Sequence, residues 1–174
     1  MASGLTIRVR REDKLKQFPE ISSRVLGDTM TTAIERVLGD AQKLSPVDRG
    51  FFRSSLDVDV RTNVSPLQVV GRIFATAQHS LVIEGVDAAG KTRRLGRQPG
   101  TFPPVDVMRA WVRRVLGIRG DEVARVAFLV SRAIARRGIK AKRPMREALN
   151  LNKDWIRGLF RDQSSRLARA LEGR

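Results

Sequence analysis

An apolar stripe between Pro19 and Leu44 is the strongest constraint on how this chain can fold. Apolar residues recur there at three- and four-residue steps, which is the period of one face of an α-helix. The stripe consists of Leu26, Met30, Ala33, Ile34, Val37, Leu38, Ala41 and Leu44. The pattern therefore predicts one long amphipathic helix with a face that other elements must cover.

Two further segments have the two-residue period of half-buried β-strands. In LTIRVR at 5–10, Leu5, Ile7 and Val9 alternate with polar residues. A second alternation starts at Leu56, and turn residues at 63–66 separate it from LQVVGRIFATA. We expect an α+β fold in which a small antiparallel sheet, made of the N-terminal strand and a β-hairpin, packs on the long helix, with additional C-terminal helices.

The stretch LSPVDRG joins the helix to the hairpin. Ser45 is expected to accept hydrogen bonds from free backbone N–H groups, with Pro46 in a first-turn position and Asp48 three residues on. Gly50 permits a sharp exit, because glycine adopts positive φ angles at little cost. We expect the strand of the hairpin to follow at once.

Residues 1–174 are predicted to form a single α+β domain with a long connection and added helices. HSLVIEG is expected to be extended or irregular, and 85–104 to be a long basic loop rich in Gly and Pro. A connection of this length without structure of its own is uncommon in a compact domain and is usually functional or disordered.

Helical patterns return beyond this loop. Residues 105–138 are predicted to be a helical insertion, with Val105, Met108, Val112 and Val115 on one face of its first helix. Asp121 is expected to open its second helix, which ends in Arg136, Arg137 and Gly138. Residues 143–174 are predicted to be a C-terminal helical arm, interrupted near 150–152.

The chain is strongly basic, with 34 Lys and Arg against 18 Asp and Glu and a formal net charge of +16. Such a field implies a polyanion or an acidic protein surface as a partner, unless the Arg content only reflects a GC-rich genome. The candidate residues for contacts with a partner or with DNA are Lys91, Arg93, Arg94, Arg97, Arg136, Arg137, Lys140, Lys142 and Arg143.

Composition argues against several classes of function. The chain has no cysteine and one histidine, which excludes disulfides, thiolate chemistry and nearly every zinc or iron site. Aromatic residues make up 5%, too few for a base-stacking platform. No apolar run approaches the roughly 20 residues that span a bilayer, and the N-terminus lacks a signal-peptide core. We expect no cofactor, no metal, no membrane contact and no export.

Three local patterns suggest chemistry but have simpler explanations. Residues 85–92, GVDAAGKT, match a phosphate-binding loop, yet the following RRLGRQPGTFPP cannot form the helix that such a loop requires. His79 lacks a visible nucleophile or orienting partner, so it is expected to be a packed or surface residue. Asp57 and Asp59 share a strand face without further oxygen ligands, which favours solvated carboxylates facing Arg neighbours.

Several short strings, in order, resemble a known family. AQKLSPVDRGFFRSSL is similar to a stretch of the tail-completion or neck proteins of long-tailed phages, the minor tail protein Z-like family. The residues that carry this match are Ser45, Pro46, Val47, Asp48, Gly50, Arg53, Ser54 and Ser55. A second string matches through Ala77, Glu84 and Gly85, and a closing string through Arg143, Pro144 and Ala148.

The resemblance covers roughly residues 5–160 and has departures. The usual Tyr of the second string is replaced near Gln78 and His79, the usual Phe of the third by Met145, and the helices from Val105 to Arg137 are a longer insertion than the minimal family domain carries.

This resemblance implies a structural virion protein that is not an enzyme. It would form a homo-oligomeric ring of six copies at the head–tail junction, after assembly in the host cytoplasm. Its partners would be further copies of itself, a connector or head-closure protein, a tail-terminator ring and packaged DNA. From the charge alone, the alternative is a non-specific nucleic-acid-binding protein.

Overall fold

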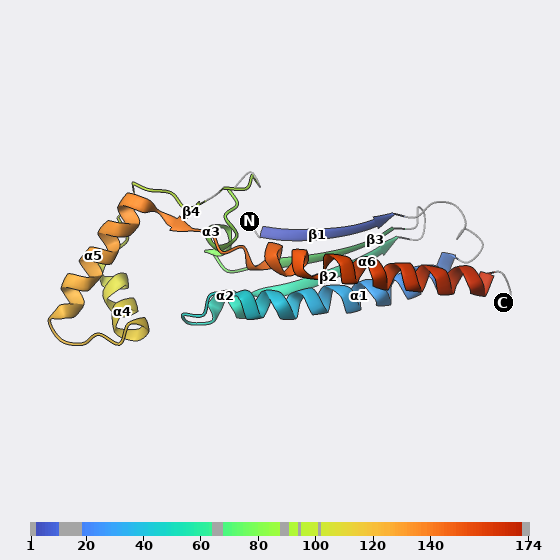
Figure 1. Cartoon of the computed structure of the whole chain (residues 1–174), viewed down its shortest axis with the longest axis horizontal. Coiled ribbons are helices and arrows are strands. Elements are labelled where there is room, and N and C mark those ends of the chain that lie inside the picture. Colours follow the sequence, from blue (N-terminus) through green and yellow to red (C-terminus); the bar gives the residue numbers. More distant parts are fainter. Residues whose placement is uncertain are drawn as a thin grey trace. The chain divides into compact units, whose positions relative to one another are not determined.

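The computed structural model describes residues 3–10, 19–63, 68–87, 91–93, 95–100 and 102–171 (Figure 1). It divides into two compact units. We call the first the frame, which contains Met1–Ser80 and Arg143–Arg174, and the second the inserted unit, Leu81–Lys142. The chain was predicted to be one domain with a helical insertion over 105–138. Instead, the second unit starts more than twenty residues earlier and includes the basic loop.

The frame contains the expected antiparallel sheet (Figure 1). Strands β1 (Ser3–Arg10), β2 (Leu56–Asn63) and β3 (Gln68–Ala75) are ordered β1-β3-β2, and β3 is antiparallel to both neighbours. The sequence prediction of an N-terminal strand added to a hairpin is confirmed. The structure describes the backbone of β1 but not the side chains of Leu5, Ile7 and Val9, so their predicted inward direction lies outside what is described.

The long helix α1 (Pro19–Leu44) has the predicted bounds and packs on β2 and β3. Met30 and Ile34 of the predicted stripe are fully buried. Gly71 of β3 lies directly under them, since a Cβ atom there would be 2.7 Å from the Met30 sulfur. A glycine at this position therefore allows the helix and the sheet to approach closely.

Helix α6 (Pro144–Leu171) covers another side of α1, and the two helices run in opposite directions (Figure 1). Met145, Ala148 and Ile156 of α6 are buried. The segment predicted to be an arm therefore contributes to the core of the frame. The predicted interruption near 150–152 is wrong, because α6 continues through these residues.

A polar cluster explains why α6 is continuous. The buried Asn152 donates from Nδ2 to Asp40 Oδ2 at 2.8 Å and accepts at Oδ1 from Arg36 Nε at 2.8 Å. Arg36 also lies over the Trp155 ring, with its Cζ atom 4.2 Å from the ring centroid. Hydrogen bonds from Asn152 and then from Lys43 hold the pKa of the Asp40 carboxyl below its ordinary value. The asparagine is thus satisfied by contacts that α1 supplies.

The corner after α1, residues 45–50, is held by a hydrogen bond at its start and a left-handed glycine at its end. Ser45 is buried and donates its hydroxyl to the Ala41 carbonyl at 2.6 Å, so it closes the end of α1. The predicted role of Ser45 as an acceptor for free N–H groups is therefore wrong. Pro46 and Asp48 lie in the turn, and Gly50 has a φ of 76°. The positive φ predicted for Gly50 is confirmed.

A short helix, α2 (Phe51–Ser54), lies between this corner and β2, where the sequence predicted an immediate strand. Phe52 is buried, and its ring centroid is 6.3 Å from that of His79. Four residues are too few to show helical periodicity, which is why the pattern did not reveal α2.

The inserted unit contains a helical hairpin and a small two-stranded sheet. Helices α4 (Val105–Val115) and α5 (Glu122–Arg137) form a hairpin around the buried Val112, Val123 and Ala127. Val105 and Met108 pack on this cluster as predicted, whereas Val115 is exposed. Asp121 precedes α5 and Gly138 ends it, but the Asp121 side chain makes no capping hydrogen bond.

Helix α3 and the pair of short strands correct two sequence predictions. Helix α3 (Ser80–Glu84) replaces the extended segment expected in HSLVIEG. Strand β4 (Leu95–Arg97) pairs antiparallel with β5 (Ile139–Lys140), so the basic loop has structure of its own.

Replacing Gly50 with valine should lower the free energy of unfolding by about 1–2 kcal/mol, because a β-branched residue is strained at positive φ. Urea denaturation of the full chain measures the change. The control is Gly39→Ala in α1, where an added Cβ meets no atom within 4 Å and alanine favours the helix. If Gly50→Val is as stable as the wild type, the corner does not need this backbone conformation.

The Asp40 cluster should make stability depend on acid pH. Because the folded pKa of Asp40 is lowered, its stabilisation is present above the unfolded pKa near 3.8 and is lost as pH falls through the folded value. Asp40→Asn should therefore be less stable than the wild type at pH 7, with the difference shrinking below pH 3.8.

Urea denaturation at roughly ten pH values between 7 and 2.5 measures how this difference in stability changes with pH. Asn152→Ala removes the leading donor to Asp40 and should flatten the same pH dependence. If the free energies of unfolding of the wild type and Asp40→Asn differ by the same amount at every pH, the lowered pKa of Asp40 is contradicted.

Candidate functional site

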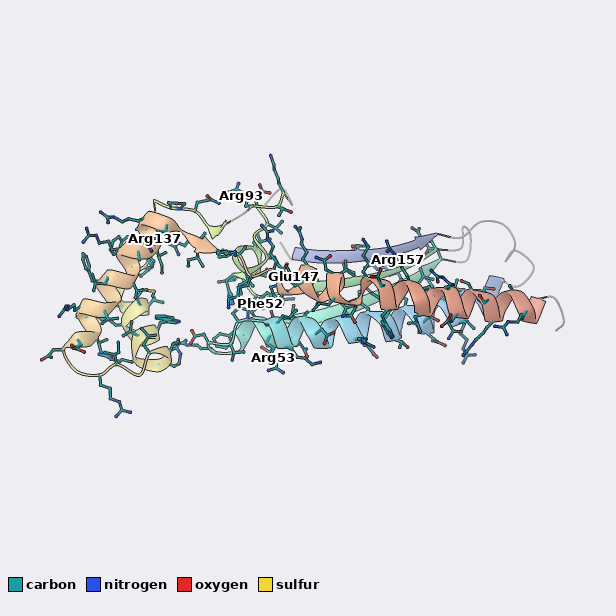
Figure 2. The ribbon with its side chains drawn as sticks, in the orientation of Figure 1. Phe52, Arg53, Arg93, Arg137, Glu147 and Arg157 are labelled. Atoms are coloured by element: carbon teal, nitrogen blue, oxygen red, sulfur yellow. The ribbon has the colours of Figure 1, made fainter. Side chains whose placement is uncertain are left out.

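Most of the basic residues singled out in the sequence lie in the inserted unit. We call the pair β4 and β5 the ribbon. In it Arg97 lies opposite Ile139, and Lys140 lies opposite Leu95. Arg136 and Arg137 end α5 immediately before β5, and the Arg137 side chain is labelled there in Figure 2. Two basic runs that lie some forty residues apart in the sequence are therefore brought onto one small structure.

Asp87 and Lys91 are joined by two hydrogen bonds ahead of the ribbon. The Asp87 backbone N–H donates to the Lys91 carbonyl at 3.0 Å, and Asp87 Oδ1 accepts from the Lys91 backbone N–H at 2.8 Å. Asp87 Oδ2 also pairs with the Arg93 guanidinium at 3.3 Å. Figure 2 labels the Arg93 side chain. Arg93 is therefore oriented by Asp87, while Lys91 remains exposed.

The described residues of the 85–92 string do not have the structure of a phosphate-binding loop. Thr92 bridges back to Val86, and neither Lys91 nor Thr92 begins a helix. The helix N-terminal N–H groups that cradle phosphates in such a loop are therefore not provided at Lys91.

Close packing and backbone hydrogen bonds hold the ribbon in place. A Cβ atom on Gly96 would overlap the Val82 carbonyl oxygen, so β4 and α3 are in direct backbone contact. The Lys142 N–H donates to the Ile83 carbonyl at 3.0 Å, and the Gly100 N–H donates to Ala135 at 2.8 Å. These contacts fix the backbone that carries the basic side chains of the ribbon.

Arg94 and Arg143 are not part of this arrangement in the inserted unit. Arg94 lies outside the described residues. Arg143 belongs to the frame, where its carbonyl accepts the Glu147 N–H at 2.9 Å and so starts α6. The members of the predicted set that the structure describes in the inserted unit are therefore Lys91, Arg93, Arg97, Arg136, Arg137, Lys140 and Lys142.

The residues considered for catalysis or metal binding have structural partners. Asp59 pairs with Arg61 at 2.7 Å, and Asp57 Oδ1 accepts the Val58 N–H at 2.8 Å. His79 is exposed beside Phe52. Across the described ranges no group of three or more His, Cys, Asp or Glu side chains is placed to hold a metal ion. In the same residues no helix is long and apolar enough to cross a membrane.

Sequence reasoning missed one surface of the inserted unit. Arg125, Phe128 and Leu129 are exposed on the side of α5 opposite the buried Val123 and Ala127. The 3.6-residue period of α5, applied to its exposed side as well as its apolar side, could have revealed this set.

Comparison of the chain with models of known protein families, with curated proteins and with solved structures gives no match.

Proposed function

We propose that the protein is a structural virion component of a tailed phage, a neck or tail-completion protein that forms a homo-oligomeric ring of six copies at the head–tail junction. Its other partners would be connector or head-closure proteins, a tail-terminator ring and packaged DNA. It would assemble in the host cytoplasm and would not be an enzyme.

One observation carries this proposal: each of the three matching strings contains a residue with a left-handed backbone. The φ angles are 76° at Gly50, 64° at Gly85 and 58° at Arg143. Arg143 is the one non-glycine residue with positive φ in the described part of the chain. Such angles are uncommon outside glycine and indicate a required turn. Each string thus contains a backbone position that the fold constrains, which is what a resemblance based on fold predicts.

The buried members of these strings favour a structural role for them. Phe52 in the first string and Pro144 and Ala148 in the third are buried in the frame. The first string also presents exposed apolar side chains at Val47 and Phe51. In addition, β1 and β2 are the two edges of the described sheet, and their open backbone groups can pair with neighbouring subunits.

Mass photometry and negative-stain microscopy of the full chain test the ring. We expect ring particles with about six times the 19.5 kDa subunit mass, and the protein should also be present in purified virions of the phage that encodes it. Phe51→Ser should weaken assembly, whereas Arg53→Gln, on the same short helix, should not. A protein that stays monomeric at every concentration and is absent from virions would refute the proposal.

A second candidate function, non-specific binding of nucleic acid, is favoured by the convergence of basic residues on the ribbon. Arg97 lies on β4, Lys140 lies on the paired β5, and Lys142 follows two residues later. Contacts with phosphates release counterions, so binding should weaken steeply as salt rises.

Fluorescence anisotropy with a random-sequence DNA duplex from 50 to 300 mM NaCl, roughly the range in which counterion release is measurable, tests this candidate. The double variant Arg97→Gln with Lys140→Gln should make the negative slope of log K against log salt less steep by about 2, because each lost phosphate contact contributes about 0.9. The charge-matched control is Arg161→Gln with Arg166→Gln on α6. No binding at low salt, or equal effects of both pairs, would exclude the ribbon as a DNA site.

A further inference from the structure

One side of α5 presents arginines and large apolar side chains together. At 100° per residue, Arg125, Leu129, Arg132 and Arg136 fall within about 60° of one another around the helix axis. All four are exposed, and so is the neighbouring Phe128. We call Arg125, Phe128, Leu129, Arg132 and Arg136 the α5 outer face.

The apolar part of this face extends beyond the helix. The rings of Phe102 and Phe128 lie 5.8 Å apart with an interplanar angle of 39°. Hydrogen bonding of the Gly100 N–H to Ala135 fixes the segment before Phe102 against α5. Phe102, Phe128 and Leu129 are each more than 40% exposed, so the contact between the rings does not bury them.

The hairpin that carries this face has a small core. Val112, Val123 and Ala127 are its fully buried apolar residues, with a few half-buried side chains packed around them. The inserted unit exposes a larger number of large apolar side chains: Val82, Phe102, Val107, Val115, Leu116, Phe128, Leu129 and Ile139. Among these, Phe102, Phe128 and Leu129 lie together, since the two rings are in contact and Leu129 follows Phe128 on α5. Grouped apolar exposure of this kind marks a surface that another molecule covers.

The charge of the inserted unit selects the chemistry of that molecule. Residues 81–142 contain 14 Lys and Arg against five Asp and Glu. Arg125, Arg132 and Arg136 make no ion pair with any residue that the structure describes. A second copy of this unit would bring like charges together, which costs free energy.

Nucleic acid would satisfy the arginines but not the apolar side chains. Phosphate contacts come from basic and polar groups, and they leave Leu129 and the two phenylalanines without a partner. Arg and aromatic residues are instead the types enriched in the cores of protein–protein interfaces. We propose that the α5 outer face docks a partner protein whose surface combines acidic residues with exposed apolar side chains. This inference rests on the inserted unit alone and does not require the ring.

The test uses a fluorescently labelled amphipathic peptide of about 20 residues, with Leu at helical i, i+3, i+4 and i+7 spacing and Glu elsewhere. A scrambled peptide of the same composition and a DNA duplex serve as comparison probes. The full chain should bind the patterned peptide at least tenfold more tightly than the scrambled one, as measured by fluorescence anisotropy at 150 mM NaCl, where about 8 Å of screening length suppresses purely diffuse attraction.

Two variants separate the contributions of the face. Leu129→Ser with Phe128→Ser should weaken the patterned peptide at least tenfold and leave DNA binding unchanged. Arg125→Gln with Arg132→Gln should weaken the peptide as well. The control, Leu151→Ser, removes an exposed apolar side chain of α6 in the frame and should have no effect. Circular dichroism of every variant confirms that its helices are retained.

Three results would overturn the proposal. The first is equal binding of patterned and scrambled peptides, which would indicate attraction by charge alone. The second is insensitivity of peptide binding to Leu129→Ser with Phe128→Ser. The third is concentration-dependent self-association that these two substitutions abolish, which would make a second copy the occupant. Each result can occur whether or not the protein forms rings.

Discussion

Burial of α1 on two sides is the constraint on which the frame depends. One side of the helix lies on the hairpin strands, where Gly71 leaves room for Met30, and another side lies against α6. A helix covered by both a sheet and a second helix needs more than one apolar row. The stripe of the sequence is wide enough to serve both contacts. The Asn152 cluster then favours one register of α6 on α1, because a shift along the helix would separate the buried amide from Asp40 and Arg36.

The sequence predicted the long elements of the frame well because their periodicity is strong. The bounds of α1 follow from Pro19 and from the end of the stripe at Leu44, and the three strands follow from two alternations and a hairpin turn. The place of β1 beside β3 was not predicted. Asn150 and Asn152 were misjudged because helix propensity considers a residue alone, whereas Asn152 is held by side chains more than a hundred residues away. The role of Ser45 was reversed because a hydroxyl both donates and accepts hydrogen bonds.

The candidate site was predictable as a set of residues but not as a structure. The basic runs are visible in the sequence, and their convergence is not. Strands of three and two residues carry no period that could be recognised, and they pair across more than forty residues. The α5 outer face was missed for a different reason. A search for apolar periodicity looks for what a helix buries, while Phe128 and Leu129 lie on the side that the protein leaves open.

The hydrogen bond from the Lys142 N–H to the Ile83 carbonyl has a consequence for how such a chain can diversify. The two ends of the inserted unit are held within one hydrogen bond of each other. The frame therefore needs to accommodate only the geometry of a short closed loop, whatever lies beyond it. The entropy of closing a loop grows slowly with its length, so a longer or shorter insertion at this point changes the stability of the frame little. Such a chain can change the helices and strands carried between these ends while the strands and helices of the frame stay the same.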